Sequence, residues 1–353
     1  MVNTTGVINI SGRLIGKEQP PFIIAELSGN HNQSLDRALA LIDAAADAGA
    51  DAVKLQTYTA DTMTLNMNHG DFSITDKDSL WFGRSLYDLY EEAHTPWEWH
   101  EALFNKAKER GIIAFSSPFD KTSVDFLEEL NVPCYKIASF ESTDLPLVRY
   151  VASKGKPMII STGMATVSEI EETVRAAREA GCRDLILLKC TSTYPASAEN
   201  TNISTIPHMR ALFGCEVGLS DHTMGVGVSI ASIAFGASVI EKHFTLDRSD
   251  GGVDSTFSIE PKELEILVES ATSARDSIGK VSYGPLGAEK NSVQFRRSIY
   301  VVDDIKAGQE LTAKNIRIIR PGYGLAPKHF DALLGRKANQ NLKAGTALNW
   351  DLV

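Results

Sequence analysis

Short apolar runs alternate with amphipathic stretches along most of the chain. The apolar runs predict strands, and apolar residues at three- and four-residue spacing predict helices. Strands are predicted at 22–27, 52–57, 112–117, 134–139, 157–162, 185–191, 216–221 and 239–245. A helix is predicted after each strand, at 35–50, 96–111, 121–131, 144–154, 166–181, 203–213, 226–237 and 262–279.

The predicted strands are nearly continuous apolar runs, which is typical of parallel strands buried on both faces. Eight strand–helix units of this kind predict a (β/α)8 TIM barrel, an α/β fold, over residues 1–280. A doubly wound open sheet is the alternative. However, GNHNQS after the first strand is a poor match to the glycine-rich phosphate turn of such sheets. A long insertion at 58–96 separates the second strand from its helix.

The last predicted strand lies in SVIEKHFTL, at 238–246, and carries three ionisable residues in a row. Side chains alternate along a strand, so Glu241 and His243 point to the same face. Burying a carboxylate and an imidazole together is costly unless something compensates them. His222 follows the neighbouring strand, and two histidines that leave the coordination shell open suit a metal that acts as a Lewis acid. We therefore predict that a divalent cation bound by His222 and His243 supplies the compensation.

Polar residues occur at the carboxyl end of every predicted strand. In a barrel these ends meet at one mouth, where active sites lie. Lysines and hydroxyls that converge there indicate a site for a phosphorylated or carboxylated anion. The residues are Glu26, Lys54, Gln56, Ser116, Ser117, Lys136, Ser139, Ser161, Thr162, Thr191, Ser192, Ser220, Asp221, His222, Glu241 and His243.

Each of these residues also has a structural interpretation. A lone buried lysine is often a salt-bridge partner, a lone histidine is often a hydrogen-bonded core residue, and serines can cap the helices that follow. The occurrence of polar residues at all the strand ends favours a functional site, least clearly for Ser116 and Thr191. We interpret His31 and His100 as structural or leave them open.

The composition is that of a soluble globular protein, with 43% hydrophobic and 23% charged residues. The net charge of −10 argues against a protein that binds nucleic acid or anionic membranes. No apolar run approaches the roughly 20 residues that span a bilayer, and the N-terminus lacks the pattern of a signal peptide. The four cysteines form no CxxC pair and suggest neither a zinc site nor disulfides, which fits a cytoplasmic location.

A series of motifs resembles the sialic acid synthase family in order and spacing. They are FIIAELSGNHNQS, AVKLQTY, AFSSPFD, YKIAS, ISTGMAT, CTSTYPA, GLSDHT and VIEKHFTLDR. The resemblance implies an enzyme that condenses phosphoenolpyruvate with an N-acetylated sugar, using a divalent metal such as Mn²⁺, with Mg²⁺ or Co²⁺ as alternatives. It also implies a barrel followed by a small antifreeze-like (SAF) domain, in a domain-swapped homodimer.

The resemblance also assigns roles to residues of the strand ends. His222 and His243 match the metal ligands of the family, and Glu26, Glu241 and Asp247 are the carboxylates of the catalytic centre, with Glu26 or Glu241 orienting the attacking water. Phosphoenolpyruvate would be held by Lys54, Ser117, Lys136, Ser139, Ser161 and Ser220. The sugar would be held by Gln56, Ser192, Tyr194 and, from the other subunit, Arg320.

Within the family the chain is most similar to the pseudaminic branch, because of AELSGNHNQ, the long insertion and Ser192 in CTSTYPA. This branch implies a transferase that joins phosphoenolpyruvate to 2,4-diacetamido-2,4,6-trideoxy-L-altrose and releases phosphate by C–O cleavage. The N-acetylneuraminate and legionaminate branches are alternatives. Two rivals lie outside the family: a metal-dependent pyruvate aldolase, and a non-enzymatic binding protein of the SAF type.

Two segments outside the barrel strands have predicted roles. A linker at 281–296 leads to the SAF domain at 297–353, which is small for an independent core and should dock on a partner. Arg320 in RPGYG would then reach the partner's sugar, or it simply holds a turn. The insertion should close the sugar end of the site, because its aromatic residues can pack over the mouth. These residues are Phe72, Trp81, Tyr87 and Tyr90.

Overall fold

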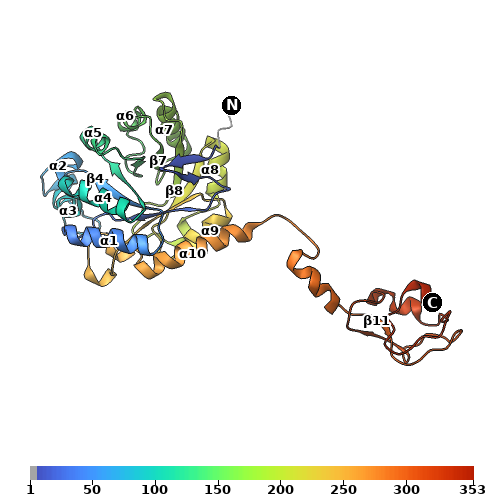
Figure 1. Cartoon of the computed structure of the whole chain (residues 1–353). Coiled ribbons are helices and arrows are strands. Elements are labelled where there is room, and N and C mark those ends of the chain that lie inside the picture. Colours follow the sequence, from blue (N-terminus) through green and yellow to red (C-terminus); the bar gives the residue numbers. More distant parts are fainter. Residues whose placement is uncertain (1–5) are drawn as a thin grey trace. The chain divides into compact units, whose positions relative to one another are not determined.

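Eight parallel strands form a closed barrel in the computed structural model (Figure 1), which describes residues 6–353. The strands are β3 (Phe22–Glu26), β4 (Ala52–Thr57), β5 (Ile113–Pro118), β6 (Tyr135–Ile137), β7 (Met158–Ser161), β8 (Leu185–Cys190), β9 (Glu216–Ser220) and β10 (Val239–His243). Each strand pairs with the next along the chain, and β10 pairs with β3 to close the ring. The predicted barrel is therefore confirmed.

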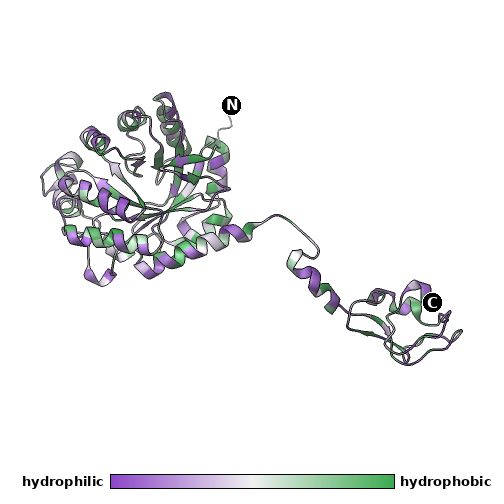
Figure 2. Ribbon diagram, in the orientation of Figure 1, coloured by the Kyte–Doolittle hydropathy of each residue, from purple (hydrophilic) through white to green (hydrophobic). Residues whose placement is uncertain are grey.

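Helices cover the outside of the barrel, in the positions that the apolar spacing predicts. Figure 2 shows hydrophobic and hydrophilic residues mixed along these helices, as expected of amphipathic segments with one buried face. Thr166 begins α7 with a capping box, in agreement with its predicted capping role. The helices are α1 (Leu35–Asp47), α4 (His100–Glu109), α5 (Lys121–Glu129), α6 (Leu145–Ala152), α7 (Val167–Glu179), α8 (Thr205–Phe213), α9 (Gly227–Ala234) and α10 (Pro261–Ile278). Across residues 6–353 no helix combines the length and the apolar character needed to cross a membrane.

A hairpin that the sequence pattern does not predict packs on the barrel at the amino ends of its strands. It consists of β1 (Ile8–Ile10) and β2 (Arg13–Ile15). Its isoleucines join the inward-facing Phe22, Phe115 and Val239 in one buried cluster. The hairpin thus closes the end of the barrel opposite the predicted site.

The insertion after β4 folds into short helices. They are α2 (Ala60–Met63), η1 (Gly70–Phe72), α3 (Leu86–Ala93) and η2 (Trp97–Trp99). At its end, His100 Nδ1 donates to the Pro96 carbonyl at 3.2 Å, and His100 Nε2 lies 2.7 Å from Thr57 Oγ1. Burial lowers the pKa of both His100 and His31 to about 4, so both rings are neutral near pH 7. Both histidines are buried and neither lines the cavity described below, in agreement with the structural interpretation.

The chain divides into two compact units after Gly279. The C-terminal unit contains the antiparallel pair β11 (Ser298–Val301) and β12 (Ile316–Ile319) and a buried core of its own, which includes Leu311 and Leu348. Part of the segment that we predict as a linker forms the exposed helix η6 (Gly287–Phe295). The remaining short helices within residues 6–353 are η3 (Ala198–Asn200), η4 (Arg248–Asp250), η5 (Ser255–Phe257), η7 (Pro327–His329), α11 (Phe330–Leu333) and η8 (Trp350–Leu352).

Candidate active site

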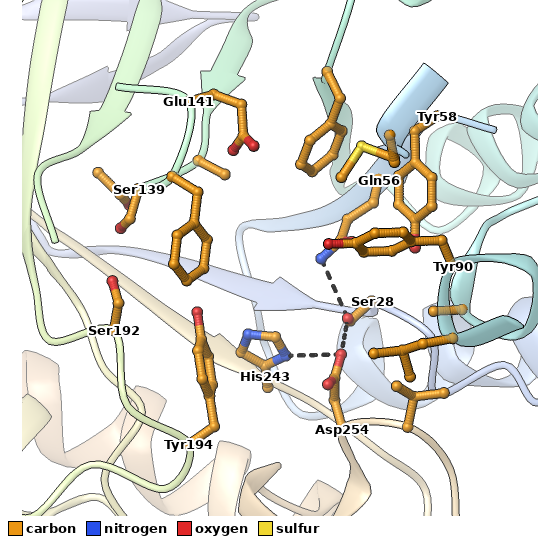
Figure 3. A pocket seen from close by; sticks show the side chains of 18 of the residues that line it. Ser28, Gln56, Tyr58, Tyr90, Ser139, Glu141, Ser192, Tyr194, His243 and Asp254 are labelled. Carbon is orange, nitrogen blue, oxygen red and sulfur yellow. Dashed lines mark hydrogen bonds and ion pairs between the residues drawn. The ribbon is translucent and has the colours of Figure 1, made fainter. Parts of the chain in front are cut away.

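A cavity of about 380 Å³ opens at the carboxyl ends of the barrel strands. Figure 3 shows side chains from several strand ends and loops turned toward it. Most of the predicted site residues line this cavity, as the convergence of strand ends in a barrel requires. They are Lys54, Gln56, Lys136, Ser139, Ser161, Ser192, Tyr194, Ser220, His222, Glu241 and His243.

Two buried lysines give the cavity its cationic part. Lys136 Nζ donates to Ser161 Oγ at 2.7 Å, and Lys54 Nζ donates to Ser117 Oγ at 3.3 Å. Lys54 also forms an ion pair with Glu26. Glu26 and Ser117 therefore lie behind the cavity wall and contact a residue that lines it. Ammonium groups beside hydroxyl donors suit an anion that carries both phosphate and carboxylate.

The carboxylate of Glu241 is compensated by lysines. Lys136 Nζ lies 3.3 Å from Glu241 Oε1, Lys54 Nζ lies 3.8 Å from Oε2, and Ser220 donates to Oε1 at 3.1 Å. Burial opposes the charge of Glu241, but the two lysines outweigh it and hold its pKa below its ordinary value. The prediction that a metal compensates the buried pair is therefore wrong for Glu241, which has its counter-charges within the protein.

His243 and His222 are neighbours at the ends of β10 and β9, with ring centroids 5.3 Å apart. His222 Nδ1 donates to the Thr191 carbonyl at 2.9 Å, which leaves the lone pair on Nε2. His243 Nδ1 is buried and has no hydrogen-bond partner among residues 6–353. Burial also lowers the pKa of His243 well below its ordinary value, so the ring is neutral. Burial opposes the charge of His222, but the neighbouring Cys190 and the Thr191 carbonyl outweigh it and raise the pKa of His222. Two adjacent imidazoles, one with a buried nitrogen that makes no hydrogen bond, fit the donor set of a divalent metal.

The described residues contain no cluster of three or more histidine, cysteine, aspartate or glutamate side chains arranged to hold a metal. A cation on His222 and His243 would therefore take the rest of its ligands from water or substrate. This open arrangement is typical of a catalytic metal site and unlike a structural one.

Asp254 is a cavity residue that sequence reasoning missed. Its Oδ2 lies 3.9 Å from His243 Nδ1 and accepts a hydrogen bond from Ser28 (Figure 3). Asp247, the carboxylate predicted for the catalytic centre, is exposed, does not line the cavity and caps η4 by accepting from Ser249 N at 2.7 Å. The predicted catalytic role of Asp247 is therefore not supported by its position. The motif VIEKHFTLDR ends at Asp247 and Arg248, but the chain returns to the cavity only at Asp254, seven residues after Asp247.

Glu141 is a second carboxylate that sequence reasoning missed. It follows β6, lines the cavity and turns its carboxylate toward it in Figure 3. Its Oε2 is buried without a hydrogen-bond partner in the described part of the chain, and burial raises its pKa. Its position just after YKIAS is the only feature of the sequence that points to the site. A glutamate in a loop is ordinarily solvated, so the sequence pattern did not predict that Glu141 would line the cavity.

The insertion supplies an apolar wall of the cavity. Trp81 and Tyr90 line it as predicted, whereas Phe72 and Tyr87 do not. Trp81 Nε1 donates to the Val253 carbonyl at 3.0 Å, and its ring lies 6.0 Å from that of Tyr194. The other insertion residues that line the cavity are Tyr58, Met63, Ile74, Leu86, Leu89 and Ala93. An apolar wall opposite a charged one suits a substrate with methyl groups at one end.

Arg320 lies just after β12 in the C-terminal unit and is exposed. The turn that follows it is held in place, because Ser298 Oγ donates to the Pro321 carbonyl at 2.6 Å and Gly322 N donates to the Gln294 carbonyl at 2.8 Å. Its guanidinium makes no hydrogen bond or ion pair within residues 6–353. The alternative that Arg320 itself holds the turn is therefore not supported.

Comparison with known proteins identifies the family of the chain. Residues 41–283 match the model of the NeuB family, and residues 296–353 match that of the SAF domain. The chain belongs to the NeuB family. The predicted family is confirmed, and so is the predicted order of a barrel followed by a SAF domain.

The relatives of this NeuB-family chain also confirm its branch. It is 46% identical to the pseudaminic acid synthase of Campylobacter jejuni, over 93% of this chain and 95% of that one. It is 43% identical to the pseudaminic acid synthase of Helicobacter pylori, over 94% and 98% of the two chains. The N-acetylneuraminic acid synthetase of Leptospira borgpetersenii superposes with a TM-score of 0.73 at 32% identity, over 83% of this chain and 96% of that one. The predictions of a synthase and of the pseudaminic branch are thus confirmed.

Proposed function

We propose that this chain joins phosphoenolpyruvate to 2,4-diacetamido-2,4,6-trideoxy-L-altrose and releases pseudaminic acid and phosphate. The observation that carries the proposal is that the cavity has a charged side and an apolar side. Lys54, Lys136 and the serine hydroxyls supply donors for a phosphorylated carboxylate on one side, and the insertion supplies an apolar wall on the other. The two histidines lie with them in the wall of the same cavity.

The residues support the following course of reaction. Carbon 3 of phosphoenolpyruvate attacks the aldehyde carbon of the open-chain sugar, and positive character develops at carbon 2. Glu241 or Glu26 orients the water that adds at carbon 2, since both carboxylates contact the lysines that would hold the anion. The resulting tetrahedral intermediate expels phosphate by C–O cleavage. Fixed ammonium and hydroxyl donors stabilise the charge as it moves, which is commonly the largest contribution in such sites.

We propose that His222 and His243 hold one divalent cation, with Mn²⁺ as the first candidate and Mg²⁺ or Co²⁺ as alternatives. A cation bound there would polarise the sugar aldehyde as a Lewis acid. Two observations among the described residues support this assignment: the buried Nδ1 of His243 makes no hydrogen bond, and the hydrogen bond from His222 Nδ1 to the Thr191 carbonyl leaves the lone pair of His222 on Nε2.

The apolar wall has a testable consequence for sugar preference. Trp81→Ala should lower the preference for the trideoxy sugar over N-acetylmannosamine by about tenfold, because a methyl group in an apolar pocket contributes a discrimination of this order. Relative kcat/KM values for the two sugars measure the effect. Phe82→Ala is the matched control, since Phe82 is exposed and does not line the cavity. If Trp81→Ala changes the melting temperature but not the preference, the insertion serves only as a structural cap.

A phosphate-release assay tests the proposed reaction. The purified chain with a divalent metal should release one phosphate per sugar consumed, fastest with the diacetamido-trideoxy sugar. Phosphoenolpyruvate labelled with heavy oxygen at its bridging position should pass the label to phosphate, because the C–O bond breaks. A pyruvate aldolase would release no phosphate, and a binding protein of the SAF type would turn over none of the sugars.

We also propose that the chain acts as a domain-swapped homodimer in the cytoplasm. Exposed apolar side chains on loops at the mouth, those of Phe140, Met164 and Met224, support coverage by a partner. The exposed Arg320 on a structured turn supports a role for the partner's SAF domain. The four cysteines are buried and free, which supports the reducing compartment.

A further inference from the structure

We propose that Ser28 is a positioning residue that orients Gln56 and Asp254 as paired hydrogen-bond acceptors for the sugar. The proposal rests on the proposed function and adds to it how the site would select a sugar. Ser28 follows β3, is buried at 2% exposure and lines the cavity between the two residues (Figure 3).

The hydrogen bonds around Ser28 run in one direction. Gln56 Nε2 donates to Glu26 Oε1 at 3.0 Å and to Ser28 Oγ at 3.2 Å. Ser28 has a single hydroxyl proton, and it donates this proton to Asp254 Oδ2. Hydrogen bonds are therefore donated from the Gln56 amide to Ser28 and from Ser28 to the Asp254 carboxylate.

The direction of these hydrogen bonds determines which acceptor atoms of Gln56 and Asp254 remain free for a substrate. Both amide protons of Gln56 are engaged, so its carbonyl oxygen remains as an acceptor. Asp254 Oδ2 accepts from Ser28, and the carboxylate keeps acceptor capacity toward the cavity that it lines. Two acceptors held in this way suit the hydroxyl and acetamido N–H donors of an amino sugar. Without the hydroxyl, the Gln56 amide would be held only by its bond to Glu26, and Asp254 would lose the donor that Ser28 supplies.

The backbone of Ser28 supports this role independently. Its φ of 47° lies in the left-handed region, which is costly for a residue with a Cβ and available to glycine without strain. Strain of this kind occurs at functional sites, where surrounding contacts hold it in place. Here the strained turn brings Ser28 Oγ to the carboxylate of Asp254. A glycine would form the turn more easily but would lose the hydroxyl.

The experiment compares Ser28→Gly with Ser11→Gly in the full-length chain. Ser11 has a similar φ of 49° and lies in the exposed β1–β2 turn at the other end of the barrel. Ser28→Gly should raise KM for the diacetamido-trideoxy sugar about tenfold and leave KM for phosphoenolpyruvate within about twofold, because a hydrogen bond to a charged group is lost on the sugar side only. Ser11→Gly should change neither value. Ser28→Ala, which keeps the strained backbone type but not the hydroxyl, should reproduce the effect of Ser28→Gly.

Two results would overturn the role of Ser28. One is an unchanged KM for the sugar in both Ser28 variants. The other is an equal rise of KM for both substrates, which would indicate a merely structural role. Failure of the proposed function is distinguishable from either, because the wild-type chain would then release no phosphate with any sugar.

Discussion

His222→Ala and His243→Ala should each lower turnover by on the order of a thousandfold while the barrel stays folded. Both rings line the cavity, and His243 Nδ1 is buried without a hydrogen-bond partner in residues 6–353. Removing either imidazole from a site with two protein ligands should leave a cation too weakly held to act. The loss should therefore appear in metal affinity as well as in rate.

Two measurements separate the metal role from a general effect on the fold. Titration of Mn²⁺ followed by electron paramagnetic resonance should show one bound ion per wild-type chain and none in either variant at the same concentrations. Circular dichroism should show unchanged helix content. His208→Ala is the control, because His208 lies on the exposed surface of α8. Near-normal activity that resists a chelator in either cavity variant would rule out the metal assignment.

Arg320→Ala should reduce turnover by about a hundredfold or more and weaken binding of the sugar far more than binding of phosphoenolpyruvate. The guanidinium has no partner within the described residues, and it lies on a turn held by Ser298 and Gln294. A charged group that is fixed in place but unused in its own unit can donate directional hydrogen bonds elsewhere. Loss of a charge-assisted hydrogen bond to the sugar should therefore appear in the sugar KM and in kcat/KM.

Mixing inactive subunits tests whether Arg320 acts across a dimer. Arg320→Ala and His243→Ala homodimers should each be nearly inactive. A mixed dimer would contain one barrel with both histidines, completed by an intact Arg320 from the other chain, and should regain part of the activity. Arg317→Ala is the matched control, because Arg317 is an exposed arginine on β12, three residues before Arg320. If mixing restores nothing although labelled subunits exchange, Arg320 does not act in trans.

The sequence by itself determined the architecture of the larger unit. Apolar periodicity is a local property, so it identified each strand and helix of the barrel without knowledge of the contacts between them. The rule that strand ends converge then brought Lys54, Lys136, Glu241 and both histidines to one mouth. The β1–β2 hairpin was not predicted, because its two strands of three residues are too short to show a hydrophobic period.

Only the tertiary structure decided which groups neutralise one another and which loop residues reach the cavity. Whether Glu241 pairs with lysines or with a metal depends on distances across the barrel, between side chains from three different strands. Likewise, Ser28 and Asp254 are 226 residues apart, and they meet because β10 pairs with β3 where the barrel closes. Loops carry no hydrophobic period that fixes the direction of their side chains. The closed barrel was therefore needed to show that Asp254, and not the predicted Asp247, lines the cavity.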